Sequence, residues 1–218
     1  MASRLISSFI DRTSTDVRDS TPDTIKSIRI YKIDFTTPQE RREQLAEKGR
    51  KLYQRCLSEG HACVLEFVAH HLAQDESDVI HDLLAFLAQE MIDLNKAKQA
   101  EMSRFLAWLE GQIGAKVDDL SGKTFIQGYI GDYQKDDPEY SPDDLIDRLT
   151  MSANRRKMQA NINDKALQGK IRVDYEKSLE ALRPLKAQLQ TTDDLIDQIV
   201  YMLYGLTEDE IAIVEGRS

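Results

Sequence analysis

The sequence predicts a mainly α-helical protein: a multi-helix bundle with long amphipathic helices and a short N-terminal strand or hairpin. Ile80, Leu84, Leu87, Met91 and Leu94 are spaced alternately four and three residues apart, which places them on one face of a helix. Helix breakers are scarce, because the 218 residues include only 10 glycines and 5 prolines. Capping sequences also recur ahead of the apolar runs, as is typical of helix starts.

The N-terminal 36 residues are predicted to form an irregular lead-in followed by one strand. The lead-in is rich in Ser, Thr and Asp up to Asp23, and apolar and polar residues then alternate from Ile28 to Phe35. A single strand leaves its backbone N–H and C=O groups unpaired, so it needs a partner. Two partners remain open: the lead-in itself, in a hairpin, or another domain or chain.

Three helices are expected next. Thr37-Pro38-Gln39-Glu40 combines a capping hydroxyl with a proline in the first turn, and predicts a helix that ends near Leu57. A short buried helix follows and ends near Gln74. Ser77 opens the longest helix, of about 34 residues and roughly 50 Å, and Gly111 marks its end.

A long loop with glycines and tyrosines is expected from Val117 to Pro142, and loops of this length often carry function. Ser141-Pro142 then restarts a helix, which we expect to continue to about Gln168. Gly169 predicts a turn, so that residues 171–190 form the second arm of a helical hairpin, kinked or interrupted at Pro184.

Two C-terminal helices complete the prediction. Thr192-Asp193-Asp194 opens one that stops at Gly205, and Thr207-Glu208-Asp209-Glu210 caps a last short one. The predicted organisation has three segments: the lead-in and strand (1–36), a helical bundle with a long central helix and a Gly/Tyr loop (37–140), and the helical hairpin with a basic patch and C-terminal helices (141–218).

Charge is distributed unevenly along the chain. The net charge is −9, yet the stretch 148–172 contains seven basic residues and one acid, which leaves the remainder at −15. These seven residues are the candidate contacts to a DNA backbone. They are Arg148, Arg155, Arg156, Lys157, Lys165, Lys170 and Arg172.

A solvated helix face explains the same residues without any ligand. No aromatic residue lies between Arg148 and Arg172 to stack on bases, which favours this simpler interpretation. If the segment is helical, residues 155–157 together with Arg148 before them and Lys165 after them would place several cations on adjacent turns, which suits phosphate contacts. Both alternatives stay open at the level of the sequence.

Several enzyme classes lack their motifs here. Ser121-Gly122-Lys123-Thr124 resembles the end of a phosphate-binding loop, but that loop needs glycine where Val117 stands. No serine or cysteine occupies a nucleophile turn, and the sequence contains neither the Glu-x-Lys of many metal-dependent nucleases nor any Asn-Pro pair of a base-methylating enzyme. We therefore predict no catalytic residue in this chain.

A metal site is the weakest alternative. His70, His71, His81 and Asp82 offer ligand types for a divalent ion, but their spacing matches no known closed site, so capping or solvated histidines are expected. Cys56 and Cys63 form no CxxC pair, which favours a reducing compartment.

No membrane contact is expected either. The longest apolar stretches are far shorter than the about 20 residues of a membrane-spanning helix. Together with the cysteine usage, this predicts a cytoplasmic protein.

Two stretches resemble one family. The tail 193–211, which reads DDLIDQIVYMLYGLTEDEI, resembles the helical ending of type IIG restriction–modification enzymes and related adenine-specific DNA methyltransferases. The stretch 77–109, with Leu120 to Thr124 after it, is similar to the C-terminal helical region of such proteins, and the strand with Thr36-Thr37-Pro38 looks like the exit from a target-recognition domain. The resemblance spans about 28–215.

This resemblance implies a role for the chain, but no catalytic residue of the family can be assigned to a position in this sequence. In that family one long polypeptide carries S-adenosylmethionine-dependent methyltransferase and DNA-reading parts, with or without an endonuclease, and this chain lacks the catalytic motifs. S-adenosylmethionine and Mg²⁺ would belong to the parent enzyme, and no cofactor or metal is expected here. The implied partners are the methyltransferase or target-recognition domain of a larger enzyme and double-stranded DNA.

Two functions are therefore expected. The first is a non-catalytic C-terminal helical module or subunit of a DNA restriction–modification or methyltransferase system. It would pack on the target-recognition domain and contact the DNA backbone. The alternative is a stand-alone acidic helical protein that inhibits a DNA-binding enzyme as a decoy.

Overall fold

The computed structural model describes residues 33–135 and 137–217, and this part of the chain is mainly α-helical, as predicted. Eight α-helices and two short 3-10 helices occur in it, and it contains no strand. They are α3 (Gln39–Glu59), α4 (Ala62–Leu72), α5 (Ser77–Ile113), η2 (Val117–Asp119), α6 (Lys123–Gln127), η3 (Tyr133–Lys135), α7 (Pro142–Thr150), α8 (Ser152–Arg155), α9 (Lys165–Tyr204) and α10 (Glu208–Val214). None of the helices in the described ranges combines the length and the apolar character that crossing a bilayer requires.

The described residues belong to two compact units. Unit 1 comprises Met1–Glu90 and Thr191–Ser218, and unit 2 comprises Met91–Gln190. The long helices α5 and α9 each contribute residues to both units. The boundaries of these units differ from those of the segments 37–140 and 141–218 predicted from the sequence. The units group residues that are close in space, whereas the segments follow the order of the chain.

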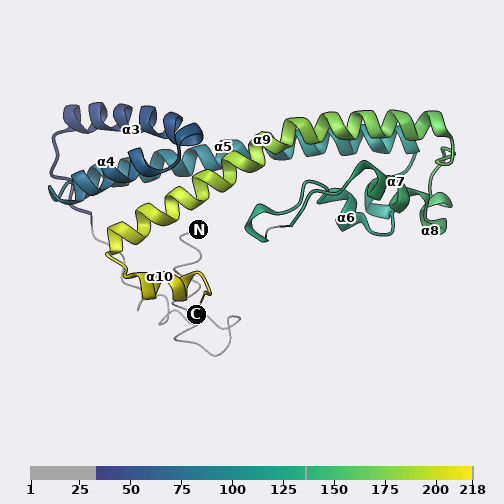
Figure 1. The fold of residues 1–218 in the computed structure, drawn as a ribbon. Coiled ribbons are helices and arrows are strands. Elements are labelled where there is room, and N and C mark those ends of the chain that lie inside the picture. Colours follow the sequence, from purple (N-terminus) through teal and green to yellow (C-terminus); the bar gives the residue numbers. More distant parts are fainter. Residues whose placement is uncertain (1–32, 136, 218) are drawn as a thin grey trace, which may run out of the picture. The chain divides into compact units, whose positions relative to one another are not determined.

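Unit 1 is built on the helical hairpin of α3 and α4, which lie side by side in Figure 1. Gly60 ends α3 with a positive φ of 87°, a conformation that favours glycine. The core of the unit is mostly aliphatic. It includes Val64, Ile80 and Leu87, whose exposed fraction is 0%. Its buried tyrosine, Tyr53, shares a hydrogen bond of 2.8 Å between its hydroxyl and that of Thr192.

Unit 2 has an aromatic centre. The rings of Phe105, Tyr129 and Tyr175 lie 5.1 to 5.4 Å apart between centroids, and all three are essentially buried. The tyrosine hydroxyls remain satisfied, since Tyr129 bonds to Ser178 at 2.7 Å and Tyr175 donates to the carbonyl of Tyr140 at 2.8 Å. Aromatic packing therefore joins α5, the loop region and α9 within this unit.

The predicted helix starts up to residue 77, at Ser141 and at Thr207 are confirmed. The helix expected from residue 37 is α3, and the expected long helix begins at Ser77 and runs to Ile113. Capping boxes form at Ser141 with Asp144 and at Thr207 with Glu210, as the sequence pattern indicates. The expected strand lies largely outside the described residues, and residues 33–36 form no regular secondary structure.

The predicted helix from 142 to about 168 is wrong. α7 ends at Thr150, α8 is a single turn, and residues 156–164 are not helical. Polar side chains bond to the local backbone here, which competes with a continuous helix. Asn161 Oδ1 accepts the N–H of Asn163 at 3.2 Å, and Asp164 Oδ1 accepts that of Ala166 at 2.9 Å, which starts α9 at Lys165.

The predicted breaks at Gly169, at Pro184 and before Thr192 are also wrong. α9 runs unbroken from Lys165 to Tyr204 and contains all three positions. Pro184 leaves the carbonyl of Glu180 without its helical donor, but both residues are exposed, so water can satisfy that carbonyl. The predicted helical hairpin is consequently a single long helix preceded by an irregular basic segment.

Candidate nucleic-acid interface

A buried asparagine fixes the start of the basic segment. Asn154 in α8 is 0% exposed. Its Oδ1 accepts the backbone N–H of Ser121 at 2.7 Å, and its Nδ2 donates to the carbonyls of Ser121 at 3.1 Å and Arg148 at 2.9 Å. One amide thus joins α8 to the turn before α6 and to the end of α7, using both donors and its acceptor.

The three cations that follow Asn154 form what we call the basic turn, residues 155–157. All three side chains are exposed. On the far side of the turn Met158 is buried, and the backbone N–H groups of Gln159 and Ala160 both donate to the carbonyl of Ile113 at 3.1 Å. This carbonyl is one of the unpaired acceptors at the end of α5, so the turn is anchored at both ends.

Within the described part of the chain, the polar contacts of the side chains of the basic turn are to backbone carbonyls. Arg156 Nε donates to the carbonyl of Ser152 at 3.3 Å, and Lys157 Nζ donates to that of Asp119. Among the described residues, no carboxylate lies within ion-pair distance of Arg155, Arg156 or Lys157. Their charges are therefore available to an anionic ligand.

Arg148 is held by an aromatic ring and a glycine. Its guanidinium carbon lies 4.8 Å from the centroid of the Phe125 ring, on which Tyr140 also stacks at 3.7 Å. Gly122, with a φ of +77°, lies against the same side chain, and a Cβ there would come within 2.7 Å of Arg148 Cδ. The positive φ favours glycine at position 122, and a Cβ there would displace the Arg148 side chain from its present place.

The remaining predicted contacts lie on α9. Lys165 and Lys170 are exposed, and no hydrogen bond or ion pair within the described chain links them to Arg148 or to the basic turn. Arg172 pairs with Asp143, with Nε 3.2 Å from the carboxylate. Arg148 and the basic turn are thus linked through Asn154, whereas Lys165 and Lys170 have no such link in the described chain. The charge of Arg172 is compensated by Asp143.

Sequence reasoning missed the residues that organise this site. It found no aromatic residue between Arg148 and Arg172, whereas the aromatic partner of Arg148 is Phe125, which precedes that interval. The sequence offers one signal, which is that the polar residue Asn154 directly precedes three cations. This pattern does not reveal that the Asn154 side chain is buried.

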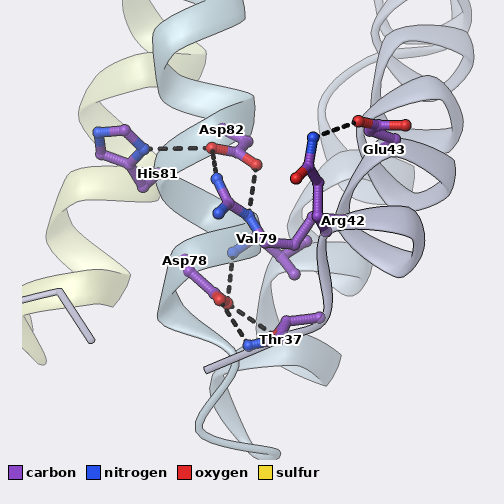
Figure 2. Close-up of polar contacts among 8 residues, drawn as sticks. Thr37, Arg42, Glu43, Asp78, Val79, His81 and Asp82 are labelled. Atoms are coloured by element: carbon purple, nitrogen blue, oxygen red, sulfur yellow. Dashed lines mark hydrogen bonds and ion pairs between the residues drawn. The ribbon is translucent and has the colours of Figure 1, made fainter. Parts of the chain in front are cut away.

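The carboxylate of the histidine alternative, Asp82, pairs with an arginine. Asp82 accepts two hydrogen bonds from Arg42, from Nε at 2.9 Å and from Nη2 at 2.7 Å, and His81 Nδ1 lies 3.3 Å from the same carboxylate (Figure 2). The second histidine pair is separate, since His71 is buried and bonds through Nδ1 to Glu76 at 2.6 Å. Across the two described ranges, no three His, Cys, Asp or Glu residues converge as metal ligands would.

Figure 2 also shows a buried carboxylate that secures the chain ahead of α3. Asp78 is 0% exposed and accepts the backbone N–H of Thr37 at 2.8 Å, the Thr37 hydroxyl at 2.9 Å and the N–H of Val79 at 2.9 Å. Burial raises the pKa of Asp78, but the bonds from Thr37 and Val79 outweigh it and leave that pKa below its ordinary value. These bonds give the carboxylate a structural role.

Comparison with known proteins returns no relative. No protein-family model, no curated protein and no solved structure matches this chain. We therefore infer the function of this chain from the residues of the site and from the resemblance described above.

Proposed function

We propose that this chain is a non-catalytic helical module or subunit of a DNA restriction–modification or adenine-specific DNA methyltransferase system, and that it contacts the backbone of double-stranded DNA. The observation that carries the proposal is a set of four cations, Arg148 and the basic turn, with no carboxylate partner in the described chain and with backbones fixed by one buried amide. Such cations suit phosphate contacts, which supply affinity without reading sequence.

The rest of the role follows from the resemblance of the tail and the long helices. The module would pack on the target-recognition domain of a larger enzyme, which would itself supply S-adenosylmethionine binding and any Mg²⁺ chemistry. Contacts to the backbone would fix the enzyme on the duplex, while other parts read the bases.

Binding of the full chain to a fluorescein-labelled DNA duplex tests the proposal. We expect the triple variant R155A/R156A/K157A to bind more weakly at low salt to duplexes of unrelated sequence alike. The slope of log Kd against log salt should also fall by about two to three, because each lost phosphate contact accounts for about 0.9 of that slope.

A matched triple variant controls for net charge. K96A/K98A/K135A removes the same number of positive charges from unit 2, at positions outside the candidate interface. We expect it to retain most of the affinity and the slope. Equal behaviour of the two triple variants, or no measurable binding by the unmodified chain at low salt, would refute the proposed function.

One observation favours the decoy alternative. Unit 2 contains sixteen basic and sixteen acidic residues, so unit 1, with thirteen basic and twenty-two acidic residues, carries the whole net charge of −9. A decoy would compete with DNA for a DNA-binding enzyme and would not bind DNA itself. The binding measurement above therefore separates the two functions.

A further inference from the structure

The four cations of the candidate interface come from separate parts of the chain. Arg148 lies in the last turn of α7, the basic turn begins with the last residue of α8, and the side chain of Arg148 lies against Gly122 in the turn before α6. The side-chain amide of Asn154 bonds to the N–H and carbonyl of Ser121 and to the carbonyl of Arg148. The basic turn follows Asn154 directly in the chain.

The direct role of Asn154 is to hold the local backbone. The side chain is 0% exposed, so it cannot reach a ligand, and it is uncharged, so it contributes nothing to long-range attraction. Its three hydrogen bonds satisfy two backbone carbonyls and one N–H that would otherwise be left without these partners. The effect of this residue on a ligand must therefore act through the placement of others.

We propose that Asn154 is the positioning residue that assembles Arg148 and the basic turn into one binding site for the phosphodiester backbone of double-stranded DNA. This inference rests on the proposed function and names the residue on which the geometry of its site depends. An arginine that engages a phosphate through two N–H groups must be correctly oriented, and cations on a preformed backbone lose less entropy on binding than cations on a mobile one.

Two features of the site agree with this role. The Arg148 side chain packs against Phe125 and Gly122, and Asn154 bonds to the carbonyl of the same residue. The basic turn is restrained at its far end by the bonds of Gln159 and Ala160 to Ile113, so Asn154 is the near anchor of the same turn.

The variant Asn154→Ala tests the proposal on the full chain with the labelled DNA duplex. We expect binding about tenfold weaker, comparable to the loss of one charge-assisted contact. We also expect the slope of log Kd against log salt to fall by about one, because misplaced cations no longer reach a phosphate. The substitution changes no charge, and a mere loss of stability would lower the fraction of folded protein without changing this slope.

Gln168→Ala is the matched control. Gln168 is also a buried amide of unit 2, and its Nε2 donates to the carbonyl of Ile162 at 3.0 Å. We expect this variant to lose stability but to keep the salt slope of the unmodified chain. An unchanged slope in Asn154→Ala, or an equal decrease in Gln168→Ala, would overturn the role of Asn154.

Two further measurements keep the result interpretable. Thermal unfolding establishes that each variant is folded at the temperature of binding, and Asn154→Ser, which keeps one hydrogen-bonding group in the same place, replaces Asn154→Ala if the latter does not fold. The triple variant R155A/R156A/K157A separates the two proposals. If it loses binding while the Asn154 variants do not, the positioning role fails and the proposed function stands, and if neither loses binding, the proposed function fails as well.

Discussion

The two units use their basic residues differently. Among the described residues of unit 1, six of the seven cations contact a carboxylate, and the seventh, Lys48, lies 5.6 Å from the centroid of the Phe67 ring. In unit 2, seven of the sixteen basic residues contact a carboxylate among the described residues. The other nine include every predicted DNA contact except Arg172. The paired cations are Arg41, Arg42, Arg50, Lys51, Arg55 and Arg217 in unit 1, and Lys96, Arg104, Lys116, Lys123, Lys135, Arg172 and Arg183 in unit 2.

This difference suggests two uses of basic side chains: those paired with a carboxylate contribute to the fold, and those without one are available to a ligand. In unit 1, Arg42 and Asp78 bond to neighbouring helices or to the chain ahead of α3, so removing them should change stability. At the candidate interface of unit 2, a neutral amide holds the backbone, and the four cations have no carboxylate partner among the described residues. Removing those cations should change binding and leave stability almost intact. Four expected outcomes test this contrast.

The largest effect on stability is expected for Asp78→Ala. The substitution leaves the backbone N–H and the hydroxyl of Thr37 without their acceptor, and hydrogen bonds to a charged group contribute about 1.5–3 kcal/mol. We expect the free energy of unfolding, measured by urea denaturation near neutral pH, to fall by about 2–3 kcal/mol. A loss below about 0.5 kcal/mol, the range of ordinary surface substitutions, would mean that this carboxylate does not secure the chain ahead of α3.

The same carboxylate predicts a pH dependence. The pKa of Asp78 is lower in the folded chain than in the unfolded chain, whose value is about 3.9. Its contribution to stability is therefore fully present above the unfolded pKa and is lost as the pH falls through the folded one. Urea denaturation at a series of pH values below 5 should show a smaller loss of stability in Asp78→Asn than in the unmodified chain. Parallel pH profiles would contradict the assignment.

A smaller effect is expected for Arg42→Ala. The pair with Asp82 is bidentate but partly exposed, with 23% of each side chain accessible, so solvent screens it. We expect the free energy of unfolding to fall by about 1 kcal/mol or less. Adding 1 M salt should reduce the difference between this variant and the unmodified chain, and a difference that salt leaves unchanged would point to lost packing against Phe35 instead.

The smallest effect on stability is expected for Arg155→Ala with Arg156→Ala. Both side chains are exposed and have no carboxylate partner in the described chain, so the free energy of unfolding should change by less than about 0.5 kcal/mol. Binding to duplex DNA should weaken in the same variant. A large loss of stability would show that these cations maintain the fold, as those of unit 1 do, and would remove the contrast between the units.

The sequence by itself determined the features that depend on near neighbours along the chain. The mainly helical class, the start of α5 at Ser77 and the capping boxes at Ser141 and Thr207 all follow from short-range spacing and local hydrogen bonds. The cluster of cations between Arg148 and Arg172 is likewise visible in the sequence alone. These features involve residues within a few positions of one another, and local patterns are informative at that range.

Only the tertiary structure decided where the helices break and which cations are free. Pro184 and Gly169 are tolerated inside α9. The chain is instead non-helical at residues 156–164, where the N–H groups of Gln159 and Ala160 bond to the carbonyl of Ile113, which lies far away in the sequence. Asp143 neutralises Arg172, and Phe125 holds Arg148, through contacts of the same long-range kind. A one-dimensional pattern contains the residue types but not these distances, and the free energy of each contact depends on the distance.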